Sequence, residues 1–528
     1  MSDNRKIIKG ASLVGAFTAL SRIFGLLRDM VIARYFGASP ATDAFFVAFR
    51  IPNTLRRLFA EGALTISFIP VFKEALVKEG KSEAKKISHV TFTFLSLTVV
   101  TVVLISIIFA PFIVKLIAPG FKDEKTLELT VFLTRLIFPY LFFICLVALA
   151  MAVLNSLGKF AAPAAAPVLL NIALILSAVM AGPFFEEPVT ALAIGVLMGG
   201  LAQVLLQIPF IKKEGYFPEI DFNFSHPSLK RILLLIVPAL FGVAVYQLNV
   251  FITTTVLASY LPEGSISYLY YADRFFQLPL GIFVISMATA ILPTLSEQAA
   301  SERLDDMRKS ITFSFKVITF ITLPAAAGLY AVSIPVFSLF FQGGKFDYET
   351  TLKTADALRY YALGIWAVGG IKVVAPAFYA MKDMKTPVWA AFISLIANIF
   401  FSIILMGPLL HGGLALATTL SSMINLIILI AIIGRRLGKV IDLSVISSFV
   451  KSALASLFTW YAAACICRFG NWEVDGINLE KAFVLGAAIG AGMITYTLFS
   501  YIFRSEEVGY LLKTLKERRG RKSGTPSL

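Results

Sequence analysis

The sequence predicts an all-α membrane protein that crosses the bilayer fourteen times. Hydrophobic residues make up 58% of its 528 residues, and charged residues make up 15%, against about 25% in soluble domains. Apolar stretches long enough to cross about 30 Å of hydrocarbon recur from one end of the chain to the other. Lysine and arginine gather in every second connection between these stretches.

Turn residues and charge clusters divide the chain into fourteen helical spans. The first six are 9–37, 41–72, 87–118, 126–156, 160–182 and 188–211. The next six are 229–260, 265–296, 310–341, 352–381, 386–407 and 412–434, and the last two are 444–467 and 480–503. Several exceed the twenty or so residues that a crossing needs, so we expect them to tilt, bend or project from the bilayer.

The distribution of basic residues predicts the orientation of the chain. With the N-terminus inside, the inner connections hold 30 Lys and Arg and the outer connections hold 6. This positive-inside bias places both termini in the cytoplasm. Most of the net charge of +15 then follows from topology. The basic inner surface is expected to meet anionic lipids, and nucleic acid is not an expected partner.

Two motifs recur at nearly equal offsets, which favours an internal duplication. Pro70 in ALTISFIPVFKEAL matches Pro293 in ATAILPTLSEQAA, and Asn171 matches Asn398 in the same order along the chain. An offset of six spans keeps the orientation, so the sequence predicts two parallel-repeat six-helix lobes, as in many transporters. The predicted parts are an N-lobe (1–215), a C-lobe (216–437), two extra helices (438–504) and a cytoplasmic tail, amphipathic and then disordered (505–528).

Residue patterns that carry catalysis or bind metals are missing from the sequence. It has no G-x-x-x-x-G-K-[ST], H-E-x-x-H or C-x-x-C motif, and its three histidines and three cysteines are scattered or lie in apolar segments. We therefore expect no metal, no cofactor and no ATP hydrolysis. The sequence is typical of a transporter and not of an enzyme.

Charged residues inside the first, second and eighth spans require an explanation. A lone arginine at mid-bilayer costs about 2.5–3.5 kcal/mol, so exposing Arg22, Arg28 and Arg274 to lipid would cost roughly 7–10 kcal/mol. They must face protein or a water-filled cavity. Structural ion pairs are expected to use Asp29, Asp43, Arg50, Arg57, Glu61 and Asp273.

Helical phase refines this expectation. Ser21, Gly25 and Arg28 fall within about 60° of one another, and Arg22 and Asp29 share a neighbouring face. Pairing leaves surplus cations at Arg22, Arg28, Arg56 and Arg274. Arginine binds phosphate and carboxylate with two parallel hydrogen bonds. The surplus therefore predicts a cavity for an anionic substrate.

Three segments at these positions resemble a known family. SRIFGLLRD, FGASPATDAFFVAFRIPNTLRRLFAEGA and YYADRFFQLPLG are similar to signature segments of the MurJ (MviN) family of bacterial lipid II flippases, in the multidrug/oligosaccharidyl-lipid/polysaccharide exporter superfamily. The resemblance implies movement of undecaprenyl-diphosphate disaccharide-pentapeptide from the inner to the outer leaflet for peptidoglycan synthesis.

In that family, arginines of helices 1, 2 and 8 line a cationic central cavity, and helices 13 and 14 form an apolar groove. The resemblance implies substrate contact by Arg22, Arg28, Arg56 and Arg274, with Ser21, Asp43 and Ser267 nearby. It also implies alternating access, with the two lobes rocking about the site. Candidate bend points are Gly15, Gly25, Pro52, Pro70, Pro279 and Pro293.

Other aspects of function stay open at the level of sequence. Some relatives bind sodium through acidic and amide groups, but span 7 offers Gln247 and Asn249 without a carboxylate, so a sodium site is doubtful and coupling to membrane potential or another cation is left open. Alternative functions are export of another polyprenyl-linked glycan, cation-coupled drug export, a membrane enzyme, or a scaffold. Cell-wall synthesis or division proteins are candidate partners.

Overall fold

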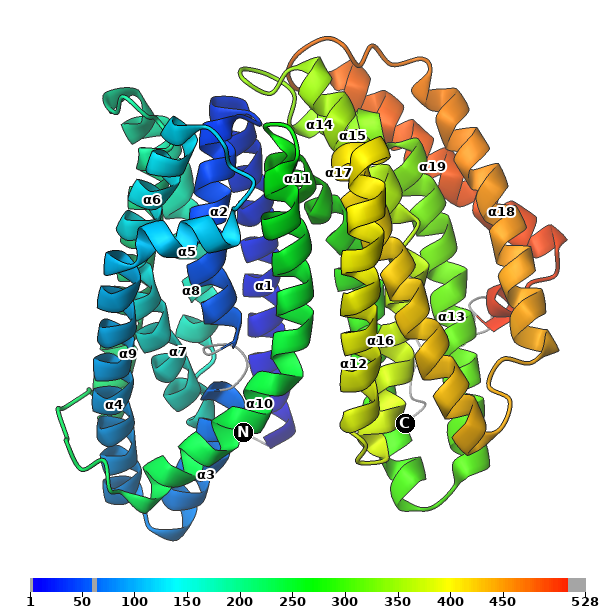
Figure 1. Ribbon diagram of the computed structural model, residues 1–528. Coiled ribbons are helices and arrows are strands. Elements are labelled where there is room, and N and C mark those ends of the chain that lie inside the picture. Colours follow the sequence, from blue (N-terminus) through cyan, green and yellow to red (C-terminus); the bar gives the residue numbers. More distant parts are fainter. Residues whose placement is uncertain (1–2, 59–63, 511–528) are drawn as a thin grey trace, which may run out of the picture. The chain divides into compact units, whose positions relative to one another are not determined.

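The protein is built almost entirely from helices, as the sequence predicts (Figure 1). The computed structural model describes residues 3–58 and 64–510. The chain forms two compact units, of which the first comprises Met1–Ser267 with Gly344–Phe346 and the second comprises Tyr268–Gly343 with Asp347–Leu528. The predicted lobe boundaries at 215 and 437 describe the sequence repeat and stay a prediction. Glu61 and the tail beyond residue 510 lie outside the described residues.

Helices of the first unit occupy the first seven predicted spans. They are α1 (Asp3–Phe36), α2 (Pro40–Leu55), α3 (Leu64–Lys78), α4 (Lys81–Ile108), α5 (Ala110–Ile117), α6 (Glu124–Ile137), α7 (Tyr140–Ser156), α8 (Ala161–Leu176), α9 (Thr190–Glu214) and α10 (Pro227–Phe251). The π-helical segments η2 (Ser177–Ala181) and η4 (Ile252–Leu257) extend α8 and α10, followed by the short 3-10 turns η3 (Gly182–Phe184) and η5 (Ala258–Tyr260).

The second unit continues through the remaining predicted spans. Its helices are α11 (Ser265–Pro279), which begins in the first unit, then α12 (Ile285–Ala300), α13 (Leu304–Ala331), α14 (Ser333–Phe340), α15 (Tyr348–Ala362), α16 (Ile365–Ala380), α17 (Lys385–Leu437), α18 (Leu443–Cys467) and α19 (Leu479–Ile502). The π-helical segment η6 (Leu280–Val284) joins α11 to α12. Spans 11 and 12 together form α17, which breaks at Leu410, where φ is 49°.

Several predicted spans are broken helices, and the breaks repeat along the chain. The break at Phe109, between α4 and α5, has a counterpart at Val332, between α13 and α14. The break between α6 and α7 recurs in the same way between α15 and α16. Nearly the same spacing separates the paired sequence motifs, so the pattern of helices supports the duplication. Pro279 ends α11 directly before η6, whereas Pro52, Pro70 and Pro293 lie inside their helices.

Not every helix passes a simple test for membrane crossing. Among the described residues, nine helices are long and apolar enough to span a bilayer, or ten if α15 and α16, bent by 41°, are one span. The charged α1 and the short α2 are not among them. The chain is thus a multi-pass membrane protein, and the count of fourteen crossings stays a prediction.

Capping residues explain where several helices begin. A side chain that precedes the helix accepts a hydrogen bond from a backbone N–H of the first turn, which has no partner within the helix. This arrangement starts α2, α6, α15, α18 and α19, at Ser39, Asp123, Asp347, Asp442 and Asn478 respectively. Gly215, in the left-handed conformation with φ 78°, ends α9.

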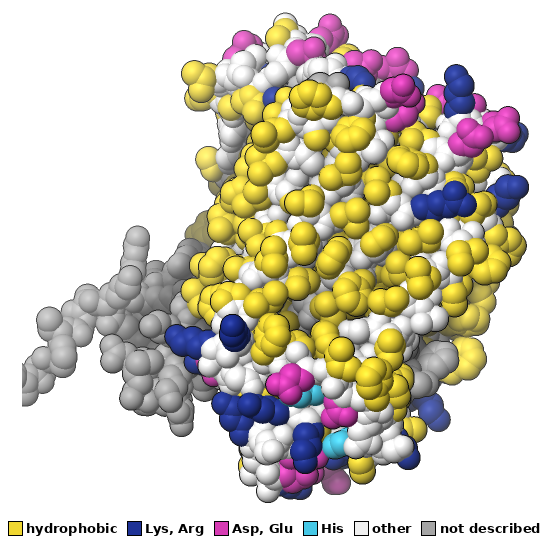
Figure 2. Space-filling view, turned by 90° about the vertical axis from the view of Figure 1, so that its left-hand side faces the viewer, with side chains coloured by type: hydrophobic (Ala, Val, Ile, Leu, Met, Phe, Trp, Pro, Cys, Tyr) yellow, Lys and Arg dark blue, Asp and Glu magenta, His cyan; other side chains and the backbone are white. Residues whose placement is uncertain are grey.

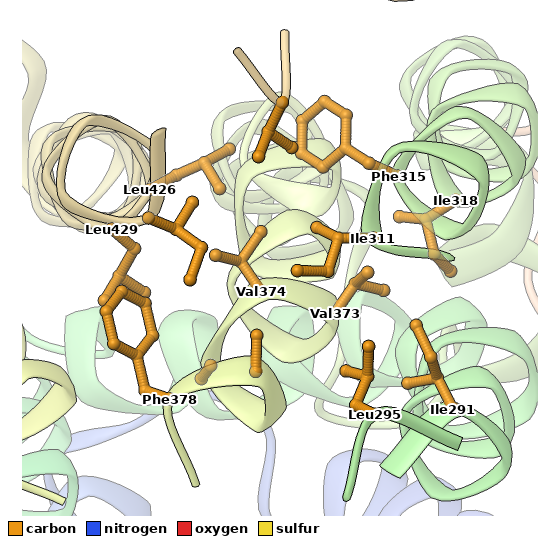
Figure 3. Packing of buried hydrophobic residues seen from close by; sticks show 14 of the residues in the cluster. Ile291, Leu295, Ile311, Phe315, Ile318, Val373, Val374, Phe378, Leu426 and Leu429 are labelled. Carbon is orange, nitrogen blue, oxygen red and sulfur yellow. The ribbon is translucent and has the colours of Figure 1, made fainter. Parts of the chain in front are cut away.

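Each unit has an apolar core of its own. In the first unit, α3, α4, α7 and α9 pack around Phe68, Phe72 and Leu154. In the second, Ile311, Ile318, Val373 and Leu429 interlock between α13, α16 and α17, as Figure 3 shows. On the face shown in Figure 2, apolar side chains form a broad band, and charged side chains gather toward the upper and lower ends. Such a band is what a bilayer-spanning surface requires.

Asp383 joins the two ends of α17. Its carboxylate accepts hydrogen bonds from Thr386 N at 3.0 Å and from Thr386 Oγ1 at 2.6 Å, and pairs with Arg436 Nη2 at 2.7 Å. The hydrogen bonds from Thr386, and then the nearby Arg436, lower the pKa of this carboxyl to about 2. A carboxylate with a depressed pKa stabilises the folded state at neutral pH.

We expect Asp383→Ala to lower the free energy of unfolding at neutral pH by about 1 kcal/mol, because a helix cap and an ion pair are lost. The stabilisation is complete above the usual Asp pKa of about 4 and disappears as the pH falls through about 2. The difference between variant and wild type should therefore shrink over that window. Thermal unfolding of the purified protein across pH measures it.

Asp305→Ala is the matched control, because Asp305 is 82% exposed and its ion pair with Arg308, at 3.1 Å, lies on the surface. It should leave the unfolding midpoint nearly unchanged. An Asp383→Ala deficit that persists at the acid end would contradict the assigned role of the carboxylate.

Candidate functional site

A buried arginine links α1 to α8 in the first unit. Arg28 Nη2 and Nε donate to Asp29 Oδ1 at 2.7 and 2.9 Å, and Arg28 Nη1 donates to Asn171 Oδ1 at 2.8 Å. Asn171 Nδ2 in turn donates to the carbonyl of Ser21 at 3.2 Å. Arg28 is 9% exposed, Asp29 1% and Asn171 6%. The ion pair of Arg28 and Asp29 is therefore shielded from water, and the neutral amide of Asn171 accepts a further hydrogen bond from the guanidinium.

The network differs from the arrangement that helical phase predicts. We expected Asp29 to lie with Arg22 and Arg28 to be left over after pairing. Instead Asp29 pairs with its neighbour Arg28, because the long arginine side chain folds back onto the adjacent carboxylate. Of these two arginines, Arg28 is therefore not a surplus cation in this structure.

Arg22 has the opposite environment. It is exposed, and it makes no hydrogen bond or ion pair with the residues that the structure describes. It lies six residues before Arg28, on the same helix. An arginine at this position on a membrane helix needs water or an anion at its guanidinium. Substrate contact by Arg22 therefore stays a prediction.

Asp43 and Ser267, by contrast, are buried and bonded to each other. Asp43 Oδ1 accepts from Ser267 N at 2.8 Å and from Ser267 Oγ at 2.6 Å, and Oδ2 accepts from Gly264 N at 2.8 Å. A carboxylate is stabilised by the first amides of a helix, here α11. The expected pairing of Asp43 with arginine is wrong: within the described residues it makes no ion pair. The hydroxyl of the fully buried Ser267 is committed to Asp43, not turned to a substrate.

Arg50 of α2, and Arg56 directly after the end of that helix, donate hydrogen bonds to neutral side chains. Arg50 Nε donates to Thr255 Oγ1 at 3.3 Å, and its Nη2 donates to Thr254 Oγ1. The sequence did not predict these hydroxyls of η4 as partners of Arg50, and the stripe of ion pairs along α2 stays a prediction. Arg56 Nε and Nη2 donate to Asn53 Oδ1, one turn earlier, at 3.2 and 3.0 Å. Arg57 is half-buried, and its predicted partner Glu61 lies outside the described residues.

Two charged residues of α11 lie in the second unit. Arg274 Nη2 donates to Tyr270 Oη, and the guanidinium carbon stands 4.4 Å from the centre of the Tyr270 ring. This contact combines a hydrogen bond with a cation–π interaction and fixes the arginine along its helix. Asp273 accepts from Gln277 Nε2, one turn later. The sequence identified Arg274 but not Tyr270, although a tyrosine four residues before an arginine is a recognisable helical pair.

Sequence reasoning also passed over two polar positions. Asn171 served only as a marker of the repeat, because its burial between two helices cannot be seen from the sequence. Lys481, counted among the outer connections, is fully buried and donates to Ser338 Oγ at 2.9 Å and to the Val474 carbonyl. In the part of the chain that the structure describes, no three His, Cys, Asp or Glu side chains come together in a way that could hold a metal ion.

The fold defines the class of protein first. The structure of a multidrug resistance transporter described as "MATE family transporter of the MOP superfamily", in an inward-facing conformation, matches with a TM-score of 0.66 over 79% of this chain and 94% of that chain. At 15% identity the match concerns the fold alone. The chain therefore has the fold of a multi-pass transporter of that superfamily.

Sequence comparison then gives the family. The family described as "Lipid II flippase MurJ" matches residues 32–474. A probable lipid II flippase MurJ of Vibrio cholerae is 35% identical over 97% of this chain and 98% of its own length, and a lipid II flippase MurJ of Burkholderia cenocepacia is 36% identical over 93% and 97%. A MurJ structure in an inward closed conformation matches with a TM-score of 0.76, at 28% identity, over 94% and 99%. The chain belongs to the lipid II flippase MurJ family.

The buried network predicts unequal effects for the two arginines of α1. We expect Arg28→Ala to destabilise the protein by about 3 kcal/mol, because Asp29 stays buried without its charge partner. Arg22→Ala, which breaks no hydrogen bond among the described residues, should cost less than about 0.5 kcal/mol. Thermal unfolding in detergent compares them.

A double variant separates loss of charge balance from loss of packing. Asp29→Asn added to Arg28→Ala removes the unpaired charge, so the pair of changes should cost less than the sum of the single changes. Equal costs for Arg22→Ala and Arg28→Ala, or strict additivity in the double variant, would show that the ion pair does not stabilise α1 against α8.

Proposed function

We propose that this protein is a lipid II flippase of the bacterial inner membrane and not an enzyme. It would move undecaprenyl-diphosphate disaccharide-pentapeptide from the inner to the outer leaflet. The observation that carries the proposal is a set of arginines within the predicted membrane spans: Arg22, Arg28 and Arg56 in the first unit, and Arg274 in the second. Family membership supports the substrate class, since the named relatives are lipid II flippases.

The chemistry of the substrate fits these arginines. A lipid-linked disaccharide-pentapeptide carries a diphosphate and peptide carboxylates, none of which can cross hydrocarbon without compensating charge. Guanidinium groups bind such anions with two parallel hydrogen bonds. Water around the arginines would replace the hydration of the sugars and the peptide, while the polyprenyl chain stays in lipid.

The environments of the arginines suggest different roles. Arg22 is exposed, so it would contact the diphosphate first. Arg28 is held by Asp29 and Asn171, which fixes its position and lowers the net charge around it. In the second unit, Arg274 is ordered by Tyr270. Buried cations with fixed partners are preorganised, so little side-chain entropy is lost on binding.

The remaining parts of the proposal concern the membrane and energy. Both termini would face the cytoplasm, where the basic connections meet anionic lipids. The apolar outer faces of α18 and α19, with Leu457 59% exposed and Ile494 71% exposed, would carry the polyprenyl tail. Alternating access without a bound cofactor would complete the cycle. The membrane potential or a coupling cation would drive it, without a dedicated sodium site. Cell-wall synthesis or division proteins are the proposed partners.

Complementation of bacteria depleted of their lipid II flippase tests the function. Wild-type protein should restore growth and the appearance of lipid II in the outer leaflet. Arg22→Ala and Arg274→Ala should abolish rescue although both proteins insert at normal levels, and Arg22→Lys should rescue only in part, because lysine binds phosphate through a single point charge.

Arg468→Ala is the matched control, because Arg468 is exposed in an outer connection, and it should rescue fully. Full rescue by Arg22→Ala and Arg274→Ala would refute the anion-binding role of these arginines. Failure of the wild-type chain to restore lipid II transport would refute the function itself.

A further inference from the structure

The first unit contains a cavity to which α1 and α2 contribute no lining residue. A cavity of about 230 Å³ opens between α4, α7, α9 and the segment that follows α9. Most of its lining is apolar, with Phe92, Val153 and Ile211 among the side chains. Three polar residues interrupt this lining: Ser88, Gln207 and Tyr216.

Two of these polar side chains are buried without a hydrogen-bond partner. Gln207 and Tyr216 are each 2% exposed. Within the part of the chain that is described, neither Nε2 nor Oε1 of Gln207 is hydrogen bonded, nor is the hydroxyl of Tyr216. Buried polar atoms are satisfied in the great majority of cases, and leaving one unsatisfied is costly. The arrangement therefore calls for an occupant that brings both a donor and an acceptor.

The expected depth of the cavity in the membrane limits which class of molecule can occupy it. The basic residues Lys212 and Lys213 mark the end of α9, and Gln207 lies five residues before Lys212, or about 8 Å along the helix. That distance places Gln207 near the boundary between head groups and hydrocarbon, where the ester and glycerol groups of lipids lie. Beside it, Phe217, Ile220 and Phe222 are 48%, 71% and 66% exposed, as in segments that insert into this boundary.

Water and a bare hydrocarbon chain both fit the cavity poorly. Apolar cavities stay dry, and each buried water needs two to four polar partners, which the apolar lining offers only near Gln207 and Tyr216. A hydrocarbon or polyprenyl chain would match the lining but would leave the amide of Gln207 unsatisfied. A chain that ends in an ester and a hydroxyl meets both requirements.

We propose that this cavity binds the acyl chain of a membrane glycerolipid that keeps a free glycerol hydroxyl, as mono- and diacylglycerols do. The ester carbonyl accepts from Gln207 Nε2 and Tyr216 Oη, and a glycerol hydroxyl donates to Gln207 Oε1. The chain lies against α7 and α9. The site is separate from the proposed substrate arginines and independent of the flippase function. It is a structural lipid site that completes the packing of α4, α7 and α9.

A photoactivatable monoacylglycerol with a mid-chain diazirine tests the proposal on the full-length purified protein. An alkane of matched length with the same diazirine, but without oxygen, serves as the second probe. In the wild type, cross-links of the monoacylglycerol should map by mass spectrometry to α7 and α9, at about thirtyfold lower concentration than those of the alkane, as expected for three neutral hydrogen bonds.

Variants separate the polar and apolar parts of the site. Gln207→Leu should weaken labelling by the monoacylglycerol about tenfold and leave labelling by the alkane unchanged. Ala150→Phe, from α7, and Val204→Phe, from α9, should each fill the cavity and abolish labelling by both probes. Leu205→Ala is the control, because Leu205 is 55% exposed on α9 and does not line the cavity. It should label as the wild type does.

Two results would overturn the proposal. Unchanged labelling in either folded cavity-filling variant would show that the chain does not enter the cavity. Equal affinity of the wild type for the two probes would show that Gln207 and Tyr216 do not recognise oxygen, and that ordered water alone satisfies them.

Discussion

The first unit depends on the hydrogen bonds and the ion pair of the Arg28 guanidinium, which is buried between α1 and α8. A charge in hydrocarbon is tolerated only when its hydrogen bonds are met inside the protein. Asp29 supplies the counter-charge from the adjacent position, and Asn171 supplies an oxygen from α8 while its own amide binds the Ser21 carbonyl. The same atoms therefore neutralise the charge and join the two helices.

Other polar groups of the two units follow this rule with neutral partners. The Asp43 carboxylate rests on the first amides of α11, Arg50 is bound by threonine hydroxyls of η4, and Lys481 is bound by Ser338 and a carbonyl. A neutral partner satisfies a hydrogen bond without itself neutralising the charge. A protein that binds an anion inside a membrane needs positive charge that ion pairs do not fully remove.

Gln207 and Tyr216 are among the buried groups for which this rule is not met within the described residues. Unlike most of the others, these two side chains line an apolar cavity. Polar groups that lack hydrogen bonds beside a cavity indicate something outside the chain that completes them. In a membrane protein the surrounding lipid is itself a structural component. A lipid molecule that enters a cavity near the boundary of the hydrocarbon can supply the hydrogen bonds that these side chains lack.

The amino-acid sequence by itself determined the all-helical membrane class, the places of the helical segments and the repeat, because hydropathy and turn residues act over short distances along the chain. It also identified Arg22, Arg28 and Arg274 as charges that need an explanation. Only the tertiary structure decided how those charges are satisfied. Helical phase placed Asp29 on the face of Arg22 and Asp43 in a stripe of ion pairs, because phase cannot show where a long side chain folds or which distant helix begins beside a carboxylate. Asn171 and Gln207 carry no local signal, because their roles arise from burial against helices far away in the sequence.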